Sequence, residues 1–327
     1  MPLHHSRQRF SLLLCSLIIC CIKLLSLVAI ASSFTTNDGA TLSYTISGKG
    51  PVVLLLSGGP GFASSMLTKL SDIVAQNNTA ILFDQRGTGK SRSGNKIDKE
   101  TIKMSRFVED IEELRVKLNI EKLILIGHSW GGALAMAYTA AHPEKVNSMV
   151  LLCSGGVDLS YRPTFSGKLN GKLSTEEKSV KSGWIRRYDD SQDPDPEGAF
   201  FGIFSSSWAG YVHDRGSVAE LDKYLKKEYS HRDINELMSA DMEGDVNDPD
   251  DDFSVVGKLS AFKGLAFILF GESDPMDHTI AEKTQKEITQ AKIITIPKSG
   301  HYPWIEKPDE FAKVLNDVML KINKTQH

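Results

Sequence analysis

Ser129 lies in the sequence GHSWGG (residues 127–132), where a run typical of a buried strand gives way to a run typical of a helix. A serine at such a junction can act as a nucleophile, because a tight strand-to-helix turn presents its hydroxyl above the edge of a sheet. The alternative is that the glycines only allow the backbone to bend sharply. The nucleophile hypothesis requires a histidine base, an orienting carboxylate and an oxyanion hole elsewhere in the chain.

Candidates for the carboxylate and the base follow two later strand-like runs. Asp274 lies three residues after the run GLAFILFG (residues 264–271), and His301 comes directly after AKIITIPKSG (residues 291–300). Because catalytic groups gather at the carboxyl ends of parallel strands, we expect both side chains to lie near Ser129. The chain order serine, carboxylate, histidine is one of the orders in which such triads occur.

Each assignment has rivals close by in the sequence. They are Glu272 and Asp277 for the acid, and His128 and His278 for the base. We prefer Asp274 as the acid because it lies in a turn that Pro275 completes. His278 opens the next helix, where a side chain usually caps the helix or faces solvent, and His128 is expected to point away from the nucleophile. The order along the chain and the placement at a strand end favour His301 as the base.

Two backbone N–H groups are candidates for the oxyanion hole. One belongs to Trp130, the residue after the nucleophile, and the other to Gly59 in the loop SGGPG (residues 57–61). Glycine in that loop lets the backbone approach a substrate closely. Each such donor contributes on the order of 10²–10³ in turnover. Catalysis would then pass through an acyl-enzyme that water, activated by His301, cleaves.

The motifs SGGPG, DQRGTGKS (residues 84–91) and GHSWGG together resemble the α/β-hydrolase superfamily across nearly all of the chain after its N-terminal segment. Within it, the chain is most similar to the proline iminopeptidases, the serine peptidases of family S33, whose typical motifs are HGGPG, DQRGxGxS and GxSWG. Ser57 stands where that family usually has histidine. The resemblance implies that Asp84 and Arg86 form a structural salt bridge that braces the loops beside the oxyanion hole.

The same resemblance implies the release of an N-terminal residue, often proline, from short peptides. Acidic side chains above the site would then bind the free α-amino group, although the family's Trp-Glu motif is not present around Trp208. The candidates for this role are Glu228, Glu236, Asp241 and Glu243. The alternative functions are a carboxylic-ester, amide or lactone hydrolase and a non-catalytic binding module. The binding module is disfavoured because every catalytic position is filled.

Strand-like and helix-like segments alternate through most of the chain, which indicates an α/β protein. Runs that are apolar on both faces predict a mostly parallel, doubly wound sheet, because helices cover such a sheet on both sides. The alternation breaks at residues 156–257, and this segment predicts a mainly helical cap inserted over the active site. We therefore expect an α/β-hydrolase fold with its core in residues 32–155 and 258–327.

Residues 1–31 have the features of a signal peptide. Arg7 and Arg9 precede a nearly uninterrupted apolar stretch that ends in Ala29-Ile30-Ala31, a small-x-small pattern of the kind that precedes cleavage. An uncleaved membrane anchor is the alternative, although Lys23 would be costly at the centre of a bilayer. The sequence predicts an exported protein, periplasmic or secreted, with membrane attachment only if the segment is retained.

Charge and composition disfavour several function classes. The net charge of −3 gives no electrostatic basis for binding nucleic acid. The acidic run at residues 241–252 lacks a glycine at the sixth loop position, which a helix–loop–helix calcium site needs, and no cysteine–histidine cluster suggests zinc. Cys153, the only cysteine after residue 31, is expected to be a buried structural thiol. We therefore predict no cofactor, no metal, and a small-molecule or short-peptide substrate.

Overall fold

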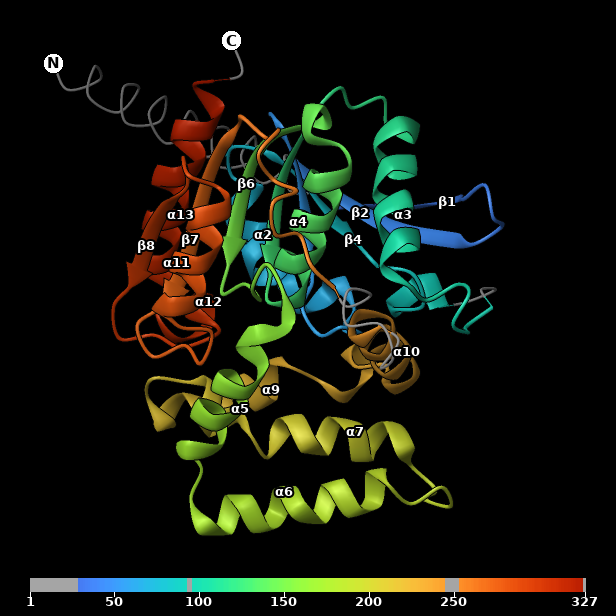
Figure 1. The fold of residues 1–327 in the computed structure, drawn as a ribbon, viewed down its shortest axis with the longest axis vertical. Coiled ribbons are helices and arrows are strands. Elements are labelled where there is room, and N and C mark those ends of the chain that lie inside the picture. Colours follow the sequence, from blue (N-terminus) through green and yellow to red (C-terminus); the bar gives the residue numbers. More distant parts are fainter. Residues whose placement is uncertain (1–28, 93–95, 245–252, 326–327) are drawn as a thin grey trace, which may run out of the picture.

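The computed structural model describes residues 29–92, 96–244 and 253–325 (Figure 1). The predicted signal peptide falls almost entirely outside these ranges, so its removal stays a prediction. Its expected cleavage position after Ala31 lies inside the first described strand, β1 (Ile30–Thr35). Among the helices of the described ranges, none is long and apolar enough to cross a membrane.

One sheet of eight strands forms the centre of the described molecule, in the order β1-β2-β4-β3-β5-β6-β7-β8. The strands after β1 are β2 (Thr41–Gly48), β3 (Val52–Leu56), β4 (Thr79–Phe83), β5 (Leu123–His128), β6 (Val146–Leu152), β7 (Leu265–Gly271) and β8 (Lys292–Ile296). Strand β2 runs antiparallel to both β1 and β4, and the other neighbouring pairs are parallel. Strand β5 is buried along its whole length, as a central strand covered on both faces must be. The predicted mostly parallel sheet is confirmed.

Helices cover both faces of the sheet. Those that flank the strands are α2 (Thr68–Val74), α3 (Met104–Lys117), α4 (Trp130–Ala141), α11 (His278–Glu287), α12 (Pro303–Glu306) and α13 (Pro308–Asn323). Helix α3 contacts α4, which packs on β5, while α2 contacts α13. In Figure 1, α4 lies in front of the strands and α2 behind them. The sheet is therefore doubly wound, and its carboxyl edge is left open for a site.

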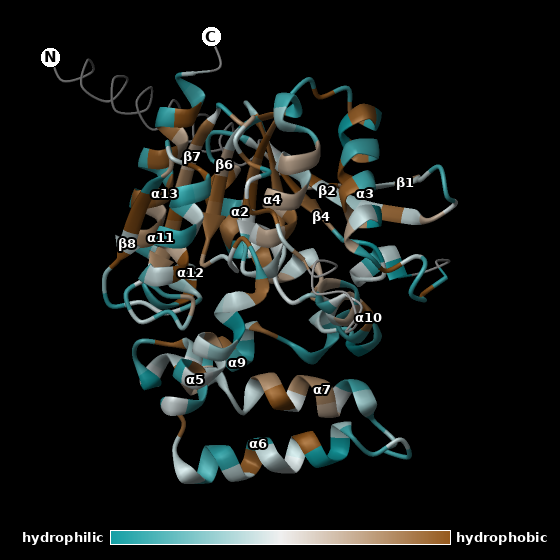
Figure 2. Ribbon diagram, viewed as in Figure 1, coloured by the Kyte–Doolittle hydropathy of each residue, from teal (hydrophilic) through white to brown (hydrophobic). Residues whose placement is uncertain are grey.

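A mainly helical segment joins β6 to β7 and lies beyond the carboxyl ends of the strands (Figure 1). Its helices are α5 (Arg162–Gly171), α6 (Thr175–Tyr188), α7 (Pro196–Ser205), α8 (Trp208–Tyr211), α9 (Val218–Tyr224) and α10 (Arg232–Glu243). Figure 2 shows hydrophobic strands in the sheet and a mixed, largely hydrophilic α6. Helix α6 packs on α7, so it forms the outer layer of this segment, whereas α5 and α10 lie closer to the sheet.

Candidate active site

Ser129 occupies the turn between β5 and α4, and its backbone is strained. Its φ of 54° and ψ of −121° are angles that residues other than glycine rarely adopt. Three backbone hydrogen bonds hold the turn: Ser129 N–H donates to Leu152 O at 3.0 Å, and Ser129 O accepts from the N–H groups of Gly132 and Gly155. Strain of this kind persists only where the surroundings fix it, and it gathers at functional sites. The turn has the geometry of a nucleophile elbow.

Glycines let α4 approach the sheet closely enough to form this turn. A Cβ on Gly127 would lie 2.3 Å from Gly131 O, and one on Gly131 would lie 2.2 Å from Leu56 O. Real Cβ atoms do not come so close to backbone oxygens, so a side chain at either position would push the helix away from β3 and β5. Glycine at these two positions is therefore required by packing. The two interpretations of the sequence are compatible, because the glycines that allow the sharp bend also form the turn that holds Ser129.

Asp274 and His301 form a buried hydrogen-bonded pair. Asp274 Oδ1 lies 2.9 Å from His301 Nδ1, and their side chains are 0% and 3% exposed. The same Oδ1 accepts from Met276 N–H at 2.9 Å, which fixes the carboxylate in the turn after β7. The backbone N–H of His301 donates to Tyr211 O at 2.7 Å and so ties the loop after β8 to α8. The two residues that the sequence selected are brought together from separate strand ends.

Ser129 and His301 line one cavity of about 270 Å³ between the sheet edge and the helices α5 and α10. The predicted oxyanion residues Gly59 and Trp130 line the same cavity. The hydrogen bonds of the described residues include none between Ser129 Oγ and His301. Catalytic hydrogen bonds are often long or misaligned without substrate and tighten when it binds. The absence of this bond is therefore compatible with proton transfer from Ser129 to His301.

The predicted oxyanion donors have no competing partner in the described chain. Trp130 is the first residue of α4, a position whose N–H has no acceptor within the helix. Gly59 has a φ of 119°, and a Cβ there would lie 2.7 Å from Gly61 N. Neither Gly59 N–H nor Trp130 N–H donates to a backbone acceptor outside the helices and strands of the described ranges. Both groups are therefore available to a substrate oxygen.

Ser57 holds the oxyanion loop in place of the histidine found in the related family. Its Oγ donates to Phe62 O at 2.7 Å, closing the loop on itself. Gln85 Nε2 donates to Ser57 O at 3.1 Å and lies 3.2 Å from its Oγ. Both side chains are fully buried. The role of Gln85 was not predicted, although its place in the motif DQRGTGKS was the signal that could have shown it.

The rival acids and His278 are engaged elsewhere. Glu272 accepts from Lys298 N–H at 2.9 Å, and Asp277 caps α11 by accepting from Thr279 N–H at 3.1 Å. His278 is exposed and lies 3.1 Å from Glu282 on the same helix. These three rivals do not line the cavity that holds Ser129, as far as the described residues define it.

His128, the remaining rival, contacts His301, the predicted base. Its ring is buried, and its Nε2 lies 3.1 Å from His301 O. Burial, together with the nearby His301, lowers the pKa of His128 well below its usual range, so the ring is neutral and Nε2 carries the proton that it donates. Its ring centroid is 4.8 Å from those of both His301 and Trp304. Nothing in the sequence indicated this contact.

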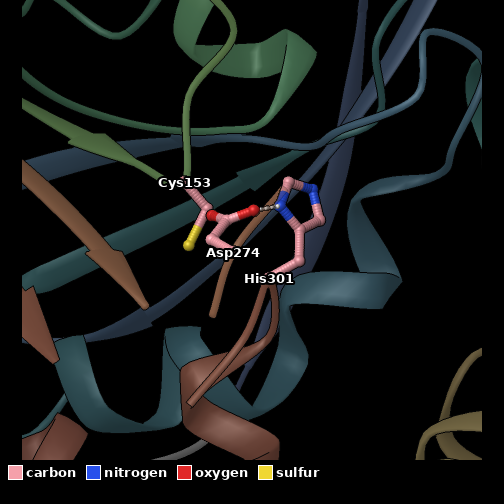
Figure 3. Close-up of side chains that lie close together, drawn as sticks. All are labelled: Cys153, Asp274 and His301. Atoms are coloured by element: carbon pink, nitrogen blue, oxygen red, sulfur yellow. Dashed lines mark hydrogen bonds and ion pairs between the residues drawn. The ribbon is translucent and has the colours of Figure 1, made fainter. Parts of the chain in front are cut away.

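The Cys153 thiol lies beside the acid (Figure 3). Its sulfur, a carboxylate oxygen of Asp274 and a ring nitrogen of His301 are within 4.8 Å of one another. Asp274 Oδ2 has no hydrogen-bond partner in the described chain, and Sγ lies 3.9 Å from Gly300 O. Burial, followed by the charge of Asp274, raises the pKa of the thiol well above its usual range, so the proton stays on sulfur. Rotation about Cβ–Sγ can direct that proton to Oδ2.

Cys153, Asp274 and His301 are also the one group of potential metal ligands among the described residues.

We expect Cys153→Ala to lower kcat and to reduce the free energy of unfolding by about 1–3 kcal/mol, the cost of an unsatisfied buried acceptor. Cys153→Ser keeps a donor beside Asp274 Oδ2 and should retain most of both quantities. Urea denaturation and steady-state kinetics of the two variants measure this difference. Equal losses in both variants would contradict a donor role for the thiol.

The expected salt bridge between Asp84 and Arg86 is wrong. Arg86 instead donates to Asp110 and to Asp38, with Nη2–Oδ1 and Nη1–Oδ2 distances of 2.5 and 2.7 Å. Asp84 accepts from the N–H and the Oγ of Ser64 at 3.0 and 2.7 Å. Both residues lie in the loop that follows β4, and there their side chains bind different partners. Each braces a different loop.

The acidic residues expected to bind a substrate amine lie outside the described lining of the cavity. Glu236 accepts from Arg232 Nε at 2.9 Å on the same helix, and Asp241 accepts from Met104 N–H at 2.6 Å. Glu228 is exposed, and Glu243 accepts from Arg162 Nη1 at 2.5 Å. The acidic loop at residues 245–252 lies outside the described residues, so a contribution from it stays untested.

Residues 51–308 match the family described as the alpha/beta hydrolase fold. The chain belongs to this family. Among curated relatives, it is 27% identical to a proline iminopeptidase of Heyndrickxia coagulans over 276 residues, which are 84% of this chain and 93% of that protein. The predicted fold and the resemblance to proline iminopeptidases are thus confirmed.

Solved structures show the same fold. A proline iminopeptidase-related protein of Thermus thermophilus superposes with a TM-score of 0.66 at 20% identity, covering 90% of this chain and 99% of that chain. An enzyme that degrades N-acyl homoserine lactones superposes with a TM-score of 0.62 at 20% identity, covering 88% of this chain and 99% of that chain. Proteins of different activity therefore share this α/β-hydrolase architecture, and the substrate must be argued from the cavity.

Proposed function

We propose that this α/β hydrolase is a serine hydrolase that acts through an acyl-enzyme. Ser129 Oγ attacks the acyl carbon and passes its proton to His301 Nε2, and Asp274 holds His301 Nδ1–H in the required tautomer. The N–H groups of Gly59 and Trp130 then bind the oxygen that becomes negatively charged. His301 gives the proton to the leaving group and activates the water that releases the acyl group.

The observation that carries this proposal is the strained Ser129 turn facing the same cavity as the buried His301–Asp274 pair. A turn that served only to bend the chain would not need a hydrogen-bonded carboxylate and histidine beside it. Here Asp274, after β7, is bonded to His301, after β8, and His301 lines the same cavity as Ser129. Nucleophile, base and orienting group come from three separate loops at one sheet edge, which is where a doubly wound fold places its active site.

Two substrate classes fit this chemistry. The name of the H. coagulans relative supports an aminopeptidase of the proline iminopeptidase type that releases N-terminal residues from short peptides. The cavity supports carboxylic esters, amides or lactones, because its described lining includes no Asp or Glu that could bind a free α-amino group. Its volume of about 270 Å³ is near the lower limit for ligand pockets, which favours a small acyl group. We propose the ester, amide or lactone class as the better fit to the site.

The deciding experiment compares turnover of proline 4-nitroanilide with that of 4-nitrophenyl acetate and 4-nitrophenyl butyrate. Activity counts only where Ser129→Ala abolishes it and the exposed-serine control Ser182→Ala keeps it. Ester turnover without anilide turnover supports the proposed class. Anilide turnover that stops when the substrate amine is acylated would instead establish the aminopeptidase. Activity that survives in Ser129→Ala would overturn the serine mechanism.

A further inference from the structure

Arg162 is the one arginine or lysine in the described lining of the catalytic cavity. It is the first residue of α5, and its side chain is 32% exposed. The lining includes apolar side chains, among them Phe165 from the same helix and Met242 from α10. A guanidinium in such surroundings is weakly screened, so its interaction with a ligand charge is stronger than it would be in water.

One side of the guanidinium is already held. Arg162 Nη1 donates to Glu243 Oε1 at 2.5 Å, which ties the first residue of α5 to the last residue of α10. Arginine has five N–H donors in a planar fork. This bond uses one nitrogen of the three, and the guanidinium also contacts the neutral Tyr161 hydroxyl. Glu243 is 60% exposed, so solvent screens its charge more than that of Arg162. The bond therefore orients the guanidinium and leaves donors for a second carboxylate.

The remaining polar groups of the lining do not supply a competing anion. Asn235 donates through Nδ2 to Pro60 O at 2.9 Å, and Ser166 and Ser239 are neutral. The described lining of the cavity therefore includes no Asp or Glu that could neutralise the positive charge of Arg162. A substrate amine would be repelled by this charge, whereas a substrate carboxylate would find a bidentate donor.

We propose that Arg162 binds a carboxylate of the substrate, so that this hydrolase acts on acyl compounds carrying a second, anionic end. The inference deepens the proposed serine hydrolase function and rests on it for the reacting acyl group. The carboxylate belongs either to the acyl part, as in the monoester of a dicarboxylic acid, or to the leaving group, as in an N-acyl amino acid. Both place the same charge on Arg162 while Ser129 attacks the acyl carbon.

The turnover test uses two matched pairs of substrates. For the acyl side, 4-nitrophenyl hydrogen glutarate is compared with 4-nitrophenyl pentanoate. For the leaving-group side, 4-(butyrylamino)benzoate is compared with butyranilide. In one of the pairs, we expect the carboxylate substrate to have a kcat/KM about ten- to hundredfold higher, the value of a hydrogen-bonded charge pair. Arg162→Gln should remove this preference, and Arg162→Lys should keep part of it because lysine retains the charge without the fork.

Arg215→Gln is the matched control, because Arg215 also lies in the helical segment and pairs with a glutamate, Glu177, but lies outside the described cavity lining. It should leave both preferences intact. Ser129-dependent turnover with no carboxylate preference in either pair would overturn the inference while leaving the hydrolase proposal standing. Equal losses for charged and neutral substrates in Arg162→Gln would also overturn it, since they would indicate a structural role.

A binding measurement separates the two proposals if turnover fails. Calorimetry with the Ser129→Ala protein compares glutaramate with pentanamide, which share an amide end and differ in the carboxylate. We expect glutaramate to bind at least tenfold more tightly, and the difference to vanish when Arg162→Gln is added. That result without turnover would retain the carboxylate site and reject the serine hydrolase. Equal binding of the two amides would reject the carboxylate site.

Discussion

Asp274→Asn is expected to lower kcat by roughly 10⁴ while leaving KM and the fold nearly unchanged. The amide matches the carboxylate in shape and can still accept from Met276 N–H, as Asp274 Oδ1 does. It cannot stabilise the imidazolium that forms when His301 takes the proton from Ser129. It can also turn its NH₂ toward His301 and hold the ring in the wrong tautomer. Steady-state kinetics on whichever substrate the Ser129-dependent assay identifies gives the two constants.

The matched control for this variant is Asp277→Asn, three residues away. Asp277 caps α11 and pairs with Lys168, and it does not touch His301 in the described structure. Its loss should cost about 1 kcal/mol or less of stability, as for a helix cap, and little activity. If Asp277→Asn lowered kcat as strongly as Asp274→Asn, the assignment of the acid from its hydrogen bond to His301 would be wrong.

The candidate catalytic residues could be selected from the sequence because each one follows a recognisable element. Ser129, Asp274 and His301 come shortly after buried strand runs, and in a parallel sheet such positions meet at one edge without any knowledge of distances. The glycines around Ser129 likewise indicated, from local sequence alone, that α4 approaches the sheet closely. The mostly parallel sheet followed from runs that are apolar on both faces.

Contacts between distant segments could not be found in this way. Arg86 was assigned to the wrong carboxylate because its partners come from the turn between β1 and β2 and from α3. One signal was available: Asp110 occupies the apolar face of α3 together with Phe107 and Ile111. A carboxylate among apolar residues at helical spacing must find a buried partner, and a buried cation was the residue to seek.

Specificity is still harder to read from the sequence, because it depends on side chains that meet only after the chain has folded. Arg162 and Glu243 are separated by most of the helical segment, and the proposed carboxylate preference depends on the orientation that their pairing gives to Arg162. Either residue alone at a helix end has an ordinary role in helix capping or solvation. The resemblance to proline iminopeptidases therefore establishes the fold more firmly than it establishes the substrate, because nearly half of the residues that line the cavity come from the inserted segment.

Arg86→Met is expected to reduce the free energy of unfolding by about 3–5 kcal/mol, the usual cost of removing one partner from a buried ion pair. Arg86 is 3% exposed and lies between Asp110, which is 1% exposed, and Asp38, which is 23% exposed. Methionine fills much of the same volume but leaves the Asp110 carboxylate buried without a cation. Urea denaturation at pH 7 measures the loss. Arg92→Met, which breaks a half-exposed pair with Asp233, is the control and should cost no more than about 1 kcal/mol.

The pH dependence of this loss distinguishes the ion pair from simple packing. Burial raises the pKa of Asp110 to about 6 even beside Arg86. For the more exposed Asp38, partial burial is outweighed by the hydrogen bonds from Arg86 and Thr36, which together lower its pKa to about 2. The contribution of Asp38 is present above its usual value of 3.8 and is lost as the pH falls toward 2. In Arg86→Met that contribution is absent at every pH, and Asp110 takes up a proton more readily. The stability difference between wild type and variant should therefore narrow in two windows: above pH 6, where Asp110 protonates in the variant before it does in the wild type, and from pH 3.8 toward pH 2, where the contribution of Asp38 to the wild type is lost. A loss caused by packing alone would stay constant in both windows.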